Sequence, residues 1–155
     1  MEIITRSKEE TEIFGAEIAK NLKGGEIFLL TGELGAGKTA LIKGLAKEMG
    51  VKKTVNSPTF VIMKVYDVKN NKNSIKKFVH IDTYRNLDIG QLMELGAFEY
   101  FGKKDAVCFV EWGAGLGGYL RSHGLDYYDI KIEHLTEHER SIYLDDDFKF
   151  ESEFF

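Results

Sequence analysis

Eight consecutive residues, Gly32 to Thr39, match the pattern G-x-x-x-x-G-K-[ST] at every fixed position. Residues 26–31 before them read as a buried strand, and residues 39–49 after them predict a helix with apolar side chains along one face. A phosphate-binding loop requires this order of strand, loop and helix. The alternative, an ordinary glycine-rich turn, would have to fill all four fixed positions by chance. The match therefore predicts a fold organised around a loop that holds a polyphosphate.

The residue types in this loop follow from the charge that it must hold. Gly32, Gly35 and Gly37 would let the backbone curl so that successive N–H groups point at a polyphosphate, at the positive end of the helix dipole. The Lys38 ammonium would lie near the β- and γ-phosphates, and the Thr39 hydroxyl would bind Mg²⁺. The predicted phosphate-binding residues are Glu33, Leu34, Gly35, Ala36, Gly37, Lys38 and Thr39.

Length and composition indicate one α/β domain followed by a short tail. The chain has 155 residues, 43% of them hydrophobic, which is enough for one core around a sheet. No apolar run approaches the roughly 20 residues of a membrane span, and the first residues do not read as a signal peptide, so we expect a cytoplasmic protein. We divide the chain into a P-loop ATPase domain, residues 1–144, and an acidic, phenylalanine-rich tail, residues 145–155.

The net charge of −4 lies entirely in that tail, which has five acidic residues and one basic residue. Neither part has the strongly basic composition of a protein that grips nucleic acid unaided. Any role in nucleic-acid metabolism is therefore expected to act through other proteins. The tail is expected to be either a loosely ordered end or a segment that docks on a partner. The single cysteine, Cys108, lies in an apolar run and is expected to be a buried strand residue.

Two acidic residues follow predicted strands and are candidates for organising Mg²⁺. Residues 60–68 and 75–82 predict an antiparallel hairpin that ends at Asp82, and the apolar run 106–110 ends at Glu111. P-loop enzymes place their metal-organising acids at the carboxyl ends of strands. One acid would organise the metal and the other would orient or deprotonate the attacking water, whereas the alternative for each is a surface hydrogen bond. The predicted catalytic residues are Lys38, Asp82 and Glu111, and the predicted metal ligands are Thr39, Asp82 and Glu111.

A proline-stiffened segment follows the loop helix. Pro58 fixes its own φ and keeps Ser57 out of the helical region, so Ser57 and Thr59 would be displayed on an extended backbone. Such hydroxyls suit a switch segment that senses the γ-phosphate or its magnesium. An ordinary turn capped by hydroxyl residues stays an equal alternative.

The other segments complete the predicted fold. The residues from Ser7 to Glu10 read as a capping box for a helix that runs to about Leu22, in which Thr11 either faces a nucleotide or is a solvated threonine. His134 and His138 straddle a predicted turn, so their spacing does not predict a zinc site. Residues 89–101 predict a helix with Leu92, Leu95 and Phe98 facing inward, residues 113–118 a flexible linker, and residues 127–135 with 140–144 a hairpin.

These elements define an α/β fold class. We expect a single-domain P-loop NTPase fold with a mixed, mostly parallel central sheet, antiparallel hairpins, and helices on both faces.

Four ordered motifs together closely resemble the TsaE family, also called YjeE. They are the loop, Ser57-Pro58-Thr59-Phe60, His80-Ile81-Asp82-Thr83-Tyr84-Arg85 and Val110-Glu111-Trp112. The resemblance covers nearly the whole chain and includes Thr11-x-x-x-Gly15, Glu94-Leu95-Gly96, Glu99-Tyr100-Phe101 and the arginine of the late hairpin. Members of this family are small bacterial P-loop ATPases needed to make threonylcarbamoyladenosine at position 37 of tRNAs that read codons beginning with A. The tail matches no motif of the family.

The resemblance implies that ATP and Mg²⁺ bind at the loop. Thr39 and Glu111 would lie near the metal with Asp82 in the same acidic cluster, and Trp112 would lie close to the nucleotide. Ser57 and Thr59 would form the switch segment, and Thr11 and Thr136 would approach the adenine. The family works with the threonylcarbamoyl transferase subunit and its catalytically inactive relative, whose cycle the ATP turnover serves, so tRNA would be involved only indirectly.

Other nucleotide-binding classes fit the residues less well. A small-molecule P-loop kinase, the main alternative, usually clusters arginines in a lid, whereas the four arginines here are scattered. A GTPase would carry Asn-Lys-x-Asp, but residues 71–74 lack the final acid. A nucleotide-gated binding module that barely hydrolyses stays open, because no arginine finger is evident beyond Arg85.

Overall fold

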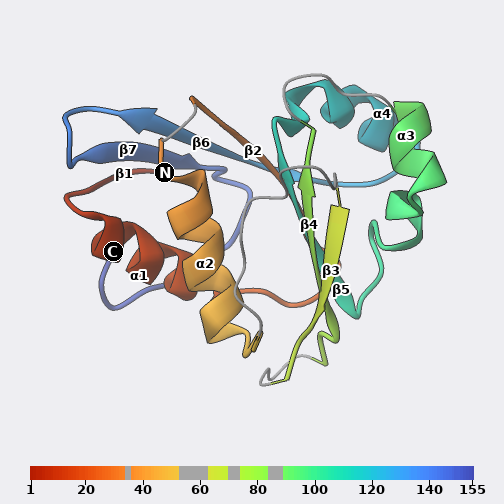
Figure 1. Ribbon diagram of the computed structural model, residues 1–155, viewed down its shortest axis with the longest axis horizontal. Coiled ribbons are helices and arrows are strands. Elements are labelled where there is room, and N and C mark those ends of the chain that lie inside the picture. The colour runs from red at the N-terminus through yellow and green to blue at the C-terminus, as the bar shows by residue number, and fades with distance from the viewer. Residues whose placement is uncertain (34–35, 53–62, 70–73, 84–88) are drawn as a thin grey trace.

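The computed structural model describes residues 1–33, 36–52, 63–69, 74–83 and 89–155. Its helices and strands alternate along most of the chain, as Figure 1 shows. The strands are β1 (Glu2–Thr5), β2 (Ile27–Gly32), β3 (Met63–Asp67), β4 (Lys77–Asp82), β5 (Ala106–Glu111), β6 (Tyr128–His134) and β7 (Arg140–Leu144). The helices are α1 (Lys8–Lys20), α2 (Lys38–Glu48), α3 (Ile89–Glu94) and α4 (Gly117–Ser122), with 3₁₀ turns η1 (Ala97–Glu99) and η2 (Gly113–Leu116).

The described strands form one mixed sheet in the order β1-β7-β6-β2-β5-β4-β3. In its centre β2 is parallel to both β5 and β6, and β4 is parallel to β5. At the two ends β3 pairs antiparallel with β4, and β7 pairs antiparallel with β6 and β1. The predicted α/β class, the mixed sheet and the antiparallel hairpins are confirmed, and the sheet is partly parallel, with three parallel and three antiparallel pairs among the described strands.

Helices cover both faces of the central strands (Figure 1). Phe28 and Leu30 of β2 pack in the core under α1 and α2, while Ile27 and Leu29 pack in the opposite core with residues of α3 and α4. Because alternate side chains point to opposite faces, a strand covered on both sides is apolar at every position. This explains why β2 reads as a continuous hydrophobic run.

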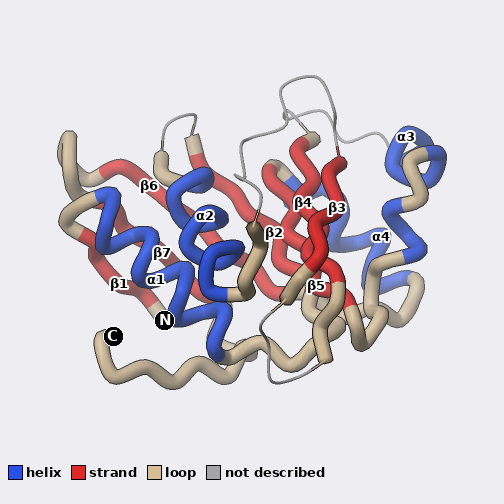
Figure 2. Tube along the Cα trace, turned by 60° about the horizontal axis from the view of Figure 1, so that its bottom comes forward, coloured by secondary structure: helices blue, strands red, loops and turns tan. Residues whose placement is uncertain are grey.

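Two glycines let α1 and α2 pack backbone against backbone. A Cβ at Gly44 would lie 1.9 Å from the carbonyl oxygen of Glu12, and one at Gly15 would lie 2.2 Å from the carbonyl oxygen of Leu41. Neither separation is possible for a real side chain, so both positions require glycine for space. The contact brings the beginning of α1 close to the loop that precedes α2, as Figure 2 shows.

The helix α1 begins with the predicted cap. The Glu10 N–H donates to the Ser7 side chain at 3.1 Å, and the Glu10 carboxylate accepts from the Arg6 N–H at 2.6 Å. In the usual capping box the Glu10 carboxylate would accept from the N–H of the N-cap residue, Ser7, whereas here it accepts from the residue before the cap. The helix ends at Lys20, two residues before the predicted end.

Two predictions on the α3 and α4 side are wrong. The predicted helix 89–101 breaks at Gly96, which has φ +80° and separates α3 from η1, and Leu95 is 40% exposed. The predicted flexible linker 113–118 instead forms η2 and the start of α4. Burial of Leu116 and Leu120 against this face of the sheet favours the helical turns despite the four glycines.

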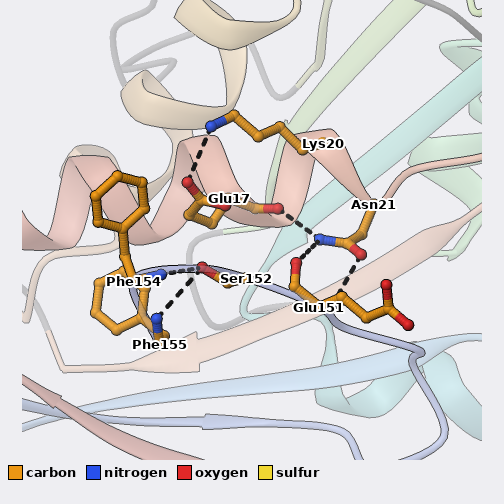
Figure 3. A network of polar contacts seen from close by, with 7 residues as sticks. All are labelled: Glu17, Lys20, Asn21, Glu151, Ser152, Phe154 and Phe155. Atoms are coloured by element: carbon orange, nitrogen blue, oxygen red, sulfur yellow. Dashed lines mark hydrogen bonds and ion pairs between the residues drawn. The ribbon is translucent and has the colours of Figure 1, made fainter.

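The tail packs on the chain's own core. Phe148 contacts Phe28 edge to face at 5.2 Å, and Phe150 and Phe155 contact Phe14 of α1 in the same way. Figure 3 shows the polar part of this contact, in which the Asn21 side chain donates to the Glu151 carbonyl and accepts from its N–H. The tail thus lies along α1, which differs from a loosely ordered end.

Across the described residues, every helix is too short or too polar to cross a lipid bilayer.

Candidate functional site

The two predicted acids end neighbouring strands on the same face of the sheet. Asp82 and Glu111 are directly opposite each other in the parallel pairing of β4 and β5. Phe78 and Phe109 of these strands lie in the core under α1 and α2. His80 and Asp82 follow Phe78 in steps of two residues, and Glu111 follows Phe109, so strand alternation directs all three to the face that α2 covers. Asp82 is 4% and Glu111 2% exposed, which excludes the alternative of surface hydrogen bonds.

The predicted phosphate-binding loop begins beside these acids because β2 lies next to β5. Leu30 pairs with Glu111 in this parallel register, two residues before Gly32. At the other end of the loop, Gly37 caps α2 with φ +111°, a left-handed conformation that favours glycine. Lys38 is the first residue of α2 and is 5% exposed, and its Nζ donates to the Gly32 carbonyl at 2.8 Å. The lysine therefore folds back over its own loop.

Gly32 serves a different purpose from the curl that the sequence predicted. Its φ does not lie in the left-handed region. A Cβ there would lie 2.6 Å from the carbonyl oxygen of Ile132, its partner on β6. Gly32 is therefore required for the close approach of β2 and β6.

A cavity of about 430 Å³ joins the loop to the acids. This volume lies in the range of small-molecule sites. The cavity brings together Lys38, Thr39, Asp82 and Glu111 with the beginning of α1 and the hairpin between β6 and β7. Its lining residues are Ser7, Lys8, Thr11, Gly37, Lys38, Thr39, Ala40, Lys43, Asp82, Glu111, Trp112, Glu137, His138 and Arg140.

Trp112 lies against the loop lysine. Its ring centroid is 3.7 Å from Nζ of Lys38, the geometry of a cation–π contact. The Trp112 backbone is left-handed, with φ +62°, and is held there because its N–H donates to Leu30 at 2.7 Å and its carbonyl accepts from the Thr83 hydroxyl at 3.1 Å. Strained backbone of this kind is found most often at functional sites.

Thr11 is buried where the beginning of α1 lines one end of the cavity. Its side chain is 1% exposed, so the alternative of a solvated threonine is wrong. Its hydroxyl is 2.7 Å from that of Thr5 and donates to the Ser7 carbonyl at 3.2 Å. The Thr11 methyl lies 3.8 Å from the position of a Cβ at Gly37. Thr11 thus joins the start of α1 to the loop.

The late hairpin contributes other residues than the predicted Thr136. Thr136 closes its own turn, where its hydroxyl accepts from the Glu139 N–H at 3.1 Å and donates to the Glu139 carboxylate at 3.2 Å. The cavity is lined instead by Glu137, His138 and Arg140. Arg140 donates through Nη1 to the carbonyls of Thr136, Glu137 and Glu139 and so holds the turn against the cavity. The sequence named this arginine only as part of a motif.

His80 is a second residue that the residue patterns did not single out. Its Nε2 lies 2.6 Å from Oε2 of Glu111, and both side chains are buried. The available signal was its position two residues before Asp82, which places both on one face of β4.

Four of the predicted loop and switch residues belong to segments that the structure does not describe. Leu34, Gly35, Ser57 and Thr59 lie outside the described residues. Of the neighbouring loop residues, Glu33 is exposed and Ala36 is fully buried.

The donors at the cavity suit a hard cation that shares its ligands with a phosphate. Asp82, Glu111 and Thr39 offer carboxylate and hydroxyl oxygens, which Mg²⁺ prefers. Within the described ranges, no three His, Cys, Asp or Glu side chains gather closely enough to hold a metal by themselves. Mg²⁺ typically takes one or two carboxylates together with substrate phosphates and water, so these residues fit it as part of a nucleotide complex.

Comparison with known proteins then decides the family. The family model described as "Threonylcarbamoyl adenosine biosynthesis protein TsaE" matches residues 5–142. The chain belongs to the TsaE family. A TsaE relative from Mycobacterium tuberculosis, named as a tRNA threonylcarbamoyladenosine biosynthesis protein, is 36% identical over 130 residues, which cover 81% of this chain and 76% of the relative. The TsaE protein of Aquifex aeolicus is 39% identical over 72% of this chain and 75% of its own.

A solved structure agrees with the fold. The crystal structure of Bacillus subtilis YdiB superposes with a TM-score of 0.65 at 31% identity and covers 93% of this chain and 83% of its own. The resemblance to TsaE that the sequence motifs indicated is therefore confirmed by comparisons that include most of the chain.

Proposed function

We propose that this TsaE-family chain binds ATP with Mg²⁺ in the cavity and hydrolyses it in support of the threonylcarbamoyl modification of tRNA adenosine 37. One observation carries the proposal: the loop residues Lys38 and Thr39 and the buried acids Asp82 and Glu111 line a single cavity. The names of the family and of its curated relatives support the role in tRNA modification, and the loop motif supports a nucleotide as the ligand.

Each residue has a role in this proposal. Lys38 would exchange its contact with the Gly32 carbonyl for the β- and γ-phosphates, and the N-terminus of α2 would stabilise their charge. Thr39 with one of the two acids would hold Mg²⁺, which neutralises charge as it develops on the transferring phosphate. The remaining acid would orient or deprotonate water. Thr11 and the Glu137–Arg140 turn would surround the nucleoside.

The cellular context belongs to the proposal as well. We infer that the chain acts in the cytoplasm together with the threonylcarbamoyl transferase subunit and its inactive paralogue, and that tRNA is reached through them. The charge of the chain supports indirect contact with tRNA, because a net charge of −4 does not favour direct binding to a polyanion. Residues 1–144 would form the ATPase domain, with residues 145–155 as a tail packed on α1.

ATP binding can be measured through Trp112, the one tryptophan of the chain, which lines the cavity. We expect Lys38→Ala to weaken ATP binding at least about 30-fold, since removing one partner of a buried charge pair typically costs 2 kcal/mol or more. Lys47→Ala is the matched control, because Lys47 is exposed on the same helix. Equal affinity of the two variants would contradict the proposed site.

Turnover and modification need separate measurements. Phosphate release should fall about 10²-fold or more in Glu111→Gln, because the substitution removes either the base or a ligand of the metal. In a bacterium that lacks its own TsaE protein, the wild-type chain should restore the modified nucleoside in tRNA, as measured by mass spectrometry, and Lys38→Ala should not. Rapid phosphorylation of a small metabolite in place of ATP hydrolysis would favour the kinase alternative.

A further inference from the structure

The buried contact between His80 and Glu111 has no role in the steps given above. His80 is 1% exposed, and its Nε2 lies 2.6 Å from Oε2 of Glu111. Since a carboxylate accepts hydrogen bonds, we assign the hydrogen of this contact to Nε2. The other ring nitrogen, Nδ1, is buried, and no hydrogen-bond partner reaches it in the described part of the chain. Within the described residues, the Glu111 carboxylate is therefore the one hydrogen-bond partner of the imidazole ring.

The main chain and the side chain of Glu111 are held separately. Thr83 donates to the Glu111 carbonyl from both its N–H and its hydroxyl, each at 3.2 Å. His80 pairs with Phe109 across the strands, so it reaches Glu111 diagonally from the adjacent parallel strand. His80 lies in β4, which pairs with β3 on one side and β5 on the other, and Thr83 follows directly after this strand. Hydrogen bonds on both sides of β4 resist local movement of His80.

We propose that His80 is a positioning residue that fixes the orientation of the Glu111 carboxylate. By holding Oε2, the imidazole selects one rotamer and leaves Oε1 as the oxygen that serves the cavity. Hydrogen bonds behind metal-organising carboxylates and imidazoles typically act in this way, and their loss reduces metal affinity or activity by 10–100-fold. This inference rests on the proposed function of the cavity, but it concerns a side chain to which the proposed mechanism gives no role.

The test compares substitutions that keep or remove the donor. His80→Gln places an amide nitrogen at nearly the distance of Nε2, His80→Asn places it too close to the main chain, and His80→Leu removes it. We expect the Mg²⁺ concentration that half-maximally strengthens ATP binding to rise about 10–100-fold in the Leu and Asn variants. The Gln variant should stay within about threefold of the wild type. Isothermal titration calorimetry measures this without turnover.

Phe78→Leu is the control for disturbed packing. Phe78 is fully buried on the same face of β4, two residues before His80, and lies in the apolar core. The Phe78→Leu substitution should lower the melting temperature and leave the Mg²⁺ requirement for ATP binding unchanged. The proposal would be overturned by equal Mg²⁺ requirements of the wild type and the Leu and Asn variants, or by an equal rise of the requirement in Phe78→Leu. A Mg²⁺ requirement of the Gln variant that is no lower than that of the Asn variant would overturn it as well. If the Leu variant does not fold, the comparison of Gln with Asn decides.

A second readout needs neither nucleotide nor metal. In ¹⁵N-detected spectra of the metal-free wild type, the His80 signals, identified by their loss in His80→Gln, should show a proton on Nε2. A proton on Nδ1 alone would overturn the inference whatever the protein binds. Failure of the wild type to bind ATP would instead contradict the proposed function, so the two failures are distinguishable.

Discussion

Replacement of Gly44 by alanine should separate α1 from α2 and damage the site between them. The added Cβ would lie 1.9 Å from the Glu12 carbonyl oxygen and 2.7 Å from its carbon. A normal contact is about 3.5 Å, so the helices would have to move apart by about 1.6 Å. Overpacking costs about 1–3 kcal/mol, and both sides of this contact are backbone that cannot rotate away, which places the cost at the upper end.

The higher helix propensity of alanine offsets part of this packing cost. Alanine is favoured over glycine in a helix by about 1 kcal/mol, which leaves a net loss of about 2 kcal/mol. For a chain of this size that loss corresponds to a fall in melting temperature of about 4–8 °C. ATP binding should weaken as well, because α1 carries Thr11 and α2 begins with Lys38, on two sides of the same cavity.

Thermal unfolding followed by circular dichroism, with an ATP titration at 20 °C below the melting point, checks both effects. Gly118→Ala is the matched control, since Gly118 lies in α4 and a Cβ there would have no neighbour within 4 Å. It should melt at or slightly above the wild-type temperature. If Gly44→Ala behaves like Gly118→Ala in both measurements, the close backbone packing of α1 on α2 is wrong.

Three further predictions concern other parts of the chain. Phe148→Ala should lower stability by about 3 kcal/mol in chemical denaturation, because Phe148 is 6% exposed in the core, whereas an unpacked tail would show no change. Burial raises the pKa of the Cys108 thiol, so a thiol reagent should react at least about 10³-fold more slowly with the native than with the denatured protein. Partial desolvation and the nearby Asp145 raise the pKa of Asp129 above its ordinary 3.8, so its ionisation opposes folding as pH rises. Asp129→Asn should therefore be more stable at pH 7, by less than about 1 kcal/mol in the free energy of unfolding, and should lose this advantage below pH 3.8, as chemical denaturation at the two pH values would show. An advantage that persisted in acid would contradict the assignment.

Local features of the chain could be predicted because they depend on residues close in sequence. The Ser7 cap, the strand before Gly32, the helix after Lys38 and the hairpin that ends at Leu144 follow from periodicity, capping and turn residues. The apolar run that ends at Glu111 was likewise predicted as a buried strand with an acid at its end.

The site required the order of the strands, which no local pattern contains. Asp82 and Glu111 meet Lys38 because β2, β5 and β4 are adjacent and parallel, and His80 reaches Glu111 only through that pairing. Where local propensity and tertiary burial disagreed, burial decided, as in the helical turns that bury Leu116 in a glycine-rich segment. The free energy of such long-range contacts comes from surfaces that only the folded chain brings together. The sequence by itself therefore predicted candidate groups for the chemistry, because their types and motifs are local, and the tertiary structure decided which of them meet.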